Sequence, residues 1–198
     1  MLEALGLPFT VVSLPVPEQA LPGEDPAETA KRLAREKAQA VASRFPHALV
    51  VGCDTIVVME GAILGKPADA TEAKSVLRCL AGREHQVLSG LAVANQSSGR
   101  LLIGCVQTLV KMREYDDRWI DEYVASRLPL DKAGAYGIQD DAFRPVESIR
   151  GCFCNVVGLP LHALAQMLTD LGVKPACLPS GCCAYREHYS SAVCQWRG

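Results

Sequence analysis

The chain has 198 residues and a formal net charge of −2, and 49% of its residues are hydrophobic and 21% charged. This length allows one domain with a sizeable core, and the near-neutral charge argues against a nucleic-acid polymer as partner. No apolar run approaches the roughly 18 residues of a membrane span. The apolar N-terminus lacks the positively charged start of a signal peptide and is interrupted by prolines. We therefore expect a cytoplasmic protein without a membrane partner.

The N-terminal half predicts strands and two helices. Residues 9–14 have the composition of a strand, and a loop rich in proline and glycine follows. Asp25, Pro26 and Glu28 form a helix start, with a capping residue, a first-turn proline and a capping box. Residues 48–59 predict two short strands joined through residues 52–55. A second helix is predicted over residues 69–81, because Asp69 and Glu72 repeat the capping pattern.

The C-terminal half predicts a hairpin, helices and a further strand. Residues 85–94 and 101–112 pair around a turn at residues 95–99, and a short helix spans residues 117–125. Residues 132–139 form a loop, residues 143–149 a strand, and Gly158 opens a last helix. Alternating strands and helices predict an α/β fold. The hairpin makes the sheet mixed rather than all parallel, with helices flanking it.

The nine cysteines predict reduced thiols, because their number is odd and no secretion signal is visible. Four of them lie in residues 175–198, which show no apolar periodicity, so we expect an irregular tail after a domain over residues 1–174. A zinc site or a redox sensor in this tail is the weaker alternative, because the paired C-x-x-C spacing of structural zinc sites is missing. The residues available for such a site are Cys177, Cys182, Cys183, His188 and Cys194.

Asp54 is the most informative single residue, because it lies between two apolar runs, residues 49–51 and 56–58. Aspartate is disfavoured in strands, and a carboxylate flanked by buried segments is costly unless it is paired or bound to a metal. Two interpretations remain open from the pattern alone. Asp54 is either a turn residue between two strands, or a metal-binding carboxylate or general base.

Several lysines suggest an anionic substrate. Lys37 falls on the apolar stripe of the first predicted helix, where it either snorkels to solvent or directs its charge into a site. Lys66 lies in a tight Gly-Lys-Pro turn, and Lys132 begins a loop of small residues that lets a ligand approach the backbone. Each is alternatively a plain surface lysine. Asn155 fits a helix cap best. Together with Asp54, these residues suit a phosphate substrate and a divalent metal.

Seven segments resemble, in order and spacing, the signature blocks of the Maf family. They are Glu18 and residues 33–38, 52–58, 64–67, 82–87, 131–139 and 155–160, and the match covers about residues 2–173. The resemblance implies a nucleoside triphosphate pyrophosphatase with a mixed α/β fold and a deep central cleft, related to inosine triphosphate pyrophosphatases. The loop that ends at Gln139 resembles the branch acting on dTTP and UTP, and differs from the branch acting on 7-methyl-GTP.

The resemblance also implies roles for individual residues. Asp54 is expected to accept a proton and, with Glu18, to bind a divalent cation, Mg²⁺ or Mn²⁺. Contact with the phosphates is expected from Lys37, Lys66 and Lys132, and selection of the base from Thr55 and Gln139. The implied partner is a small-molecule nucleotide, and a homodimer is a family expectation.

Two departures from the family pattern affect these expectations. Members begin with a strand and a Ser-x-Ser-Pro-Arg-Arg loop, whereas Met1 here falls inside the helix that follows, so we expect this phosphate loop to be missing. Glu18 also follows Pro17, where the family usually has Asp. The main hypothesis is an enzyme of nucleotide sanitation, and the alternative is an inactive nucleotide-binding paralogue.

Overall fold

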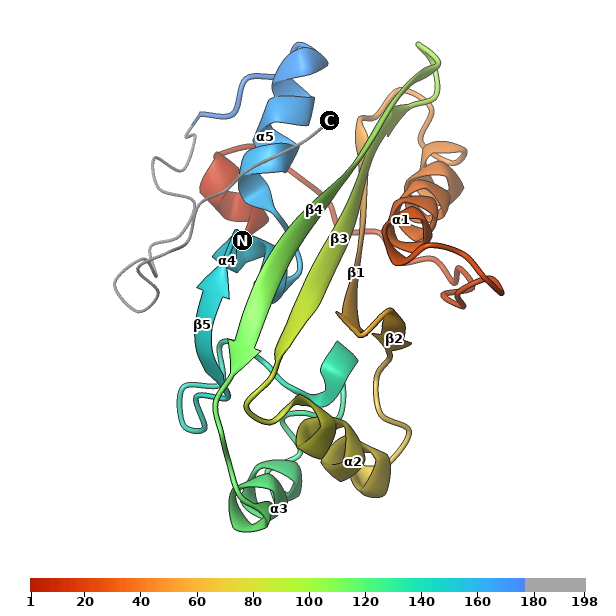
Figure 1. Ribbon diagram of the computed structural model, residues 1–198. Helices are drawn as coiled ribbons and strands as arrows, with labels where there is room; N and C mark the ends of the chain where they lie inside the picture. The colour runs from red at the N-terminus through yellow and green to blue at the C-terminus, as the bar shows by residue number, and fades with distance from the viewer. Residues whose placement is uncertain (177–198) are drawn as a thin grey trace.

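The computed structural model describes residues 1–176 and contains one five-stranded sheet (Figure 1). The strand order is β2-β1-β3-β4-β5, and every strand pairing within the described residues is antiparallel. The strands are β1 (Val50–Met59), β2 (Ala62–Leu64), β3 (Glu84–Asn95), β4 (Arg100–Met112) and β5 (Val146–Arg150). Beside β3, β1 is paired over Val50–Val58, whereas β2 pairs only with Val57–Met59. The outer edge of β1 before Val57 is therefore not paired to a strand in the described part of the chain.

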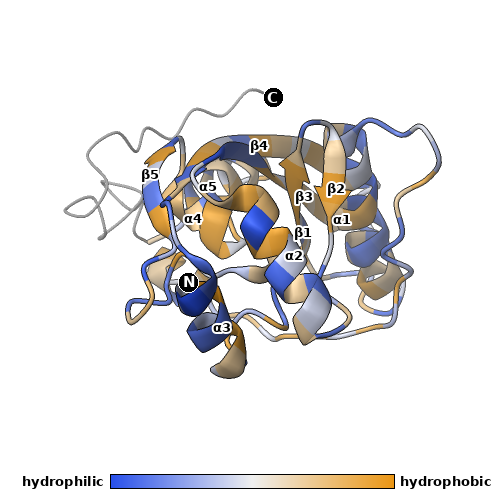
Figure 2. Ribbon diagram, turned by 60° about the horizontal axis from the view of Figure 1, so that its bottom comes forward, coloured by the Kyte–Doolittle hydropathy of each residue, from blue (hydrophilic) through white to orange (hydrophobic). Residues whose placement is uncertain are grey.

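Helices cover both faces of the sheet and one of its ends. One face packs against α1 (Pro26–Ala42), and the other against α4 (Phe153–Val157) and α5 (Leu161–Asp170), while α2 (Ala70–Leu80) and α3 (Asp117–Ala125) pack together at the end (Figure 1). Two short 3-10 turns, η1 (Leu2–Leu5) and η2 (Ala133–Ala135), complete the fold. Because helices cover both of its faces, β3 is buried along most of its length. Figure 2 shows this as apolar colouring over β3 and α4, with the more hydrophilic α3 at the rim.

Two glycines let α1 approach the sheet unusually closely. A Cβ atom on Gly90 of β3 would overlap the Ala30 carbonyl group and lie 2.7 Å from the Lys31 nitrogen. A Cβ atom on Gly52 of β1 would lie 2.7 Å from the Ala38 nitrogen and 2.9 Å from its Cβ. Neither clash can be relieved by a rotamer change, since the obstacle is helix backbone. Small residues on both sides therefore set the distance between α1 and the sheet.

The predicted helix starts are confirmed by their caps. Asp25 accepts hydrogen bonds from the backbone nitrogens of Ala27 and Glu28, and Asp69 accepts one from Glu72. The predicted hairpin, the helix over residues 117–125 and the last helix are also confirmed. The α/β fold with flanking helices is as expected, and the sheet, predicted to be mixed, is antiparallel throughout the described residues. The predicted Cys-rich tail lies almost wholly outside the described residues.

Three local predictions were wrong. Residues 9–14 form no strand, because no strand in the described residues pairs with them, and Phe9, Val11 and Val12 are 44%, 81% and 37% exposed. Residues 48–59 contain one strand rather than two, because Asp54 is paired by a lysine and does not need a turn. The predicted strand over residues 143–149 begins only at Val146, and α4 was not predicted.

A buried histidine docks the loop of residues 132–139 onto the sheet. His85 Nε2 lies 2.8 Å from the Tyr136 hydroxyl, and the two rings meet edge to face. Only 3% of His85 is exposed, and this burial lowers its pKa to about 4. The imidazole is therefore neutral in the folded protein at physiological pH.

Adding one methyl group to Gly90 should disrupt the packing of α1 against the sheet. We expect Gly90→Ala to lower the free energy of unfolding by about 2 kcal/mol or more, because overpacking against backbone cannot relax locally. Urea denaturation monitored by circular dichroism measures this change. Gly65→Ala is the matched control, because a Cβ atom there meets nothing within 4 Å. Equal stability of the two variants would contradict the close-packing argument.

Acid should destabilise the fold partly through His85. The folded-state pKa lies below the unfolded value of about 6.5, so this contribution is complete above pH 6.5 and is lost as the pH falls towards 4. Between pH 7.5 and 4.5 we expect His85→Gln to lose about 2–3 kcal/mol less unfolding free energy than the wild type. The exposed His162, changed to Gln, should behave as the wild type does. Parallel losses in all three proteins would show that His85 does not carry this effect.

Candidate active site

Three of the predicted site residues converge on one point beside β1. Lys37 Nζ lies 2.5 Å from Asp54 Oδ1 and 2.5 Å from Glu18 Oε1. Lys37 belongs to α1, Asp54 to the middle of β1, and Glu18 to the loop before α1. We call these three residues the charged cluster. Its two carboxylates exceed its single ammonium by one negative charge, which favours an additional cation.

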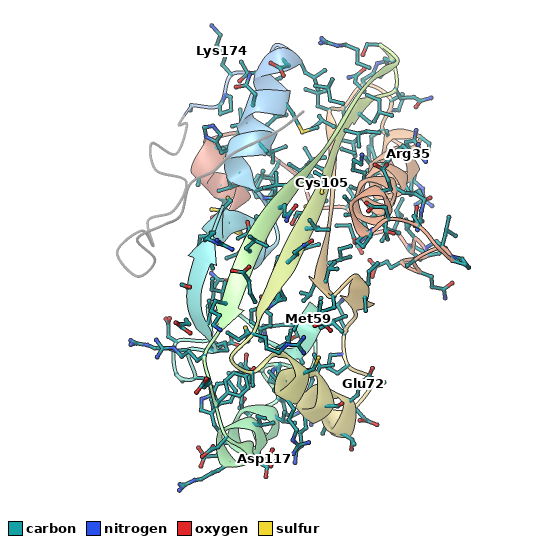
Figure 3. The ribbon with its side chains drawn as sticks, in the orientation of Figure 1. Arg35, Met59, Glu72, Cys105, Asp117 and Lys174 are labelled. Carbon is teal, nitrogen blue, oxygen red and sulfur yellow. The ribbon has the colours of Figure 1, made fainter. Side chains whose placement is uncertain are left out.

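The alternation of β1 explains how the charged cluster assembles. Successive strand residues point to opposite faces, so Asp54 shares a face with Gly52, over which α1 passes at Ala38. Lys37 directly precedes Ala38, and its contact with Asp54 shows that its side chain is directed towards the strand. Arg35, two residues earlier, is on the exposed side of this helix (Figure 3). The snorkelling interpretation of Lys37 is thus wrong, since its charge is directed into the cluster.

The charged cluster shifts the pKa values of two of its members. Burial alone would lower the pKa of Lys37, but hydrogen bonds to Asp54 and Glu18 outweigh it and the pKa is raised. The pKa of Glu18 is lowered, mainly by the hydrogen bond from Lys37, with a smaller effect of the Lys66 charge. Both groups are consequently charged at neutral pH. Asp54 is the more buried carboxylate, with 10% of its side chain exposed against 54% for Glu18.

Lys66 lies between the charged cluster and the loop of residues 132–139. Its charge acts on Glu18, and it also contributes, after Lys132, to the lowered pKa of Asp131. The loop is tied to the same turn, because the Gly134 N–H donates to the Gly65 carbonyl oxygen over 3.1 Å. The exposed Lys66 therefore adds a positive charge at the outer edge of β1, next to β2.

Lys132 and Gln139 are not part of the charged cluster in this structure. The Lys132 ammonium donates to the Leu128 carbonyl oxygen and, over 3.1 Å, to Asp131 Oδ1, so it is held within its own loop. Gln139 is exposed at the end of that loop. Neither residue therefore makes a direct contact with Asp54 in the described part of the chain.

Thr55 lies on the opposite face of β1 from Asp54. Its hydroxyl lies 2.6 Å from the Ser89 hydroxyl and donates to the Gly158 carbonyl oxygen over 3.3 Å. Ser89 was missed by sequence analysis, because only the register that pairs it with Thr55 reveals its role. Asn155 does not cap a helix as predicted. It is buried within α4 and donates to the Val87 carbonyl oxygen and the Thr108 hydroxyl.

Glu18 and Asp54 are the side chains that could hold a divalent cation. Within residues 1–176 no group of three or more His, Cys, Asp or Glu residues has the geometry of a metal centre. Two carboxylates directed at the same point nevertheless suit Mg²⁺, which typically takes one or two protein carboxylates together with substrate phosphates and water. The donor set therefore fits a cation that is shared with a phosphate substrate.

A cavity of about 810 Å³ lies elsewhere, between the β4–α3 connection and residues 141–144. Its aromatic wall includes Tyr115, Trp119 and Phe143, and it contains none of the predicted site residues. None of the helices over residues 1–176 combines the length and the apolar character that crossing a membrane requires.

Comparison with known proteins gives the chain a family. The family model described as Maf-like protein matches residues 1–171. A dTTP/UTP pyrophosphatase of Symbiobacterium thermophilum is 46% identical over 172 residues, which cover 87% of this chain and 88% of the relative. Proteins of the same name from Geobacter sulfurreducens and Dictyoglomus thermophilum are 45% and 43% identical, over 87% of this chain and 90% of each relative. The chain therefore belongs to the Maf family, as its signature blocks indicated.

Proposed function

We propose that this protein hydrolyses nucleoside triphosphates, with dTTP and UTP as substrates, to the monophosphate and pyrophosphate. The observation that carries the proposal is the charged cluster, in which Asp54 and Glu18 meet at Lys37 beside β1. Lys66 adds a further positive charge at this edge. The names of the related pyrophosphatases support the choice of substrate.

The proposed reaction needs a base and compensation of negative charge. Water attacks the triphosphate, the bond between the α- and β-phosphoryl groups breaks, and pyrophosphate leaves. We assign Asp54 as the group that takes the proton from this water, because it is the least exposed carboxylate of the cluster. Lys37, Lys66 and Lys132 neutralise phosphate oxygens, which otherwise repel the attacking water.

We further propose that Glu18 and Asp54 bind Mg²⁺ or Mn²⁺, which supplies positive charge to the phosphates. Base selection is assigned to Thr55 and Gln139, as the resemblance to the family implies. The Thr55 hydroxyl is already fixed by Ser89 and the Gly158 carbonyl oxygen, so it offers a preorganised contact. A homodimer and a cytoplasmic location remain predictions of this proposal.

Loss of the Asp54 carboxylate should abolish turnover. We expect Asp54→Asn to lower kcat for dTTP and UTP by about 10²–10⁴-fold, because the proton acceptor is removed without a change of shape. Pyrophosphate release from dTTP, UTP and 7-methyl-GTP with Mg²⁺ or Mn²⁺ measures this effect. Glu147→Gln, an exposed change on β5, is the control. No release by folded wild-type protein would favour the inactive nucleotide-binding alternative.

The cation should depend on Glu18. We expect Glu18→Gln to raise the Mg²⁺ concentration needed for half-maximal activity by about tenfold, because one of two anionic ligands becomes neutral. Titration of activity with Mg²⁺ at saturating dTTP gives this value, and Mn²⁺ binding followed by electron paramagnetic resonance gives it independently of turnover. Glu28→Gln is the matched control, since Glu28 pairs with Lys31 and lies outside the charged cluster. Identical titrations for both variants would remove Glu18 from the cation site.

A further inference from the structure

A buried tyrosine and an aspartate hold the loop of residues 132–139 in place through hydrogen bonds. The Tyr123 hydroxyl donates a short hydrogen bond to Asp140 Oδ2 and accepts one from the Gly137 N–H over 3.0 Å. Tyr123 belongs to α3 and is fully buried, whereas Asp140 directly follows Gln139. One phenol thus fixes both the backbone of the loop and the carboxylate at its end.

The Asp140 carboxylate also faces Lys132. Asp140 Oδ2 lies 4.0 Å from Lys132 Nζ, and both side chains close around Gly137. A Cβ atom on Gly137 would lie 2.8 Å from Asp140 Oδ2 and 2.8 Å from Lys132 Cε. The absence of a side chain at Gly137 is therefore what allows the aspartate and the lysine stem to meet.

Two carboxylates and the Leu128 carbonyl oxygen surround the Lys132 ammonium, and the two carboxylates differ in their exposure. Asp131 is nearer, at 3.1 Å, but 83% of its side chain is exposed, whereas 10% of the Asp140 side chain is exposed. Exposed ion pairs are weakened by solvent and salt, so the less exposed Asp140 charge also acts on the ammonium, although the Leu128 carbonyl oxygen and Asp131 accept its hydrogen bonds. The Tyr123 hydroxyl bond additionally holds Asp140 in place.

We propose that Asp140, held by Tyr123, is a positioning residue that orients the Lys132 ammonium and the adjoining Gln139 for the nucleotide. This rests on the proposed function, in which Lys132 meets phosphates and Gln139 the base. Asp140 acts through Lys132 and touches no substrate itself. Its loss therefore weakens nucleotide binding more than it slows the chemical step.

A double-mutant cycle tests whether Asp140 acts through Lys132. Asp140→Asn keeps an oxygen for the Tyr123 hydroxyl but removes the charge. We expect it to raise KM for dTTP about tenfold with kcat within about threefold. In the Lys132→Met background the same change should alter KM by less than about twofold. An unchanged or lowered KM in Asp140→Asn, or effects that multiply in the double variant, would overturn the proposal.

Two further variants separate positioning from a general loss of structure. Tyr123→Phe keeps the aromatic packing but removes both loop hydrogen bonds, so KM should rise and the Gly137 amide should exchange its hydrogen faster. Tyr115→Phe is the matched control, because the Tyr115 hydroxyl donates to the Leu77 carbonyl oxygen in α2 and not to the loop. Asp131→Asn should change KM by less than twofold. If Tyr115→Phe or Asp131→Asn matched the effect of Tyr123→Phe or Asp140→Asn, the assignment would fail.

Binding of a dTTP analogue with a non-hydrolysable α,β bridge distinguishes this proposal from the proposed function. The cycle is repeated with Kd in place of KM. If the wild-type protein binds the analogue without hydrolysing dTTP or UTP, the proposed activity fails while the cycle in Kd still decides the role of Asp140. Faster exchange at the Gly137 amide without any change in Kd would show a structural link only and would overturn the positioning role.

Discussion

The close packing of α1 against β1 and β3 is the constraint on which the charged cluster depends. Gly52 and Gly90 leave no room for a Cβ atom beneath the helix backbone, so the distance between helix and sheet is set by backbone contact. At this distance Lys37 reaches the centre of β1 and meets Asp54. Any residue larger than glycine at either position would lift α1 and lengthen the ion pair. Two residues without a side chain thus determine the geometry of the Asp54 carboxylate.

Asp54 and Lys37 also depend on each other energetically. A carboxylate in the middle of a half-buried strand costs free energy unless a partner compensates its lost hydration. Lys37 provides that compensation, and the exposed Glu18 shares the same ammonium. The pair therefore serves the fold and the site at once. The ammonium that compensates the Asp54 charge within β1 is the same group to which the proposed function assigns a phosphate contact.

The elements with local signals were predictable from the sequence, whereas those that depend on distant partners were not. Asp25 and Asp69 make the starts of their helices predictable, because each caps its helix through hydrogen bonds within one turn. Residues 9–14 have the composition of a strand, but composition does not show whether a neighbouring strand exists to pair with them. The pattern alone left open whether Asp54 is a turn residue or a functional carboxylate, because its partner lies 17 residues away on a helix. The family blocks named Lys132 and Gln139 but did not include Asp140, whose role appears only when α3 places Tyr123 beside it.

The division of the site between the two faces of β1 restricts how one nucleotide can contact all of it. Asp54 and Thr55 are consecutive in a strand, so their side chains point to opposite faces. One ligand can reach both only around the edge of the strand. Before Val57 the outer edge of β1 is not paired to a strand within residues 1–176, and Lys66 and the loop of residues 132–139 lie along this side. The charged cluster and the Thr55 hydroxyl are thus separated by the strand itself, so under the proposed function the phosphates and the base of one nucleotide contact different faces of β1.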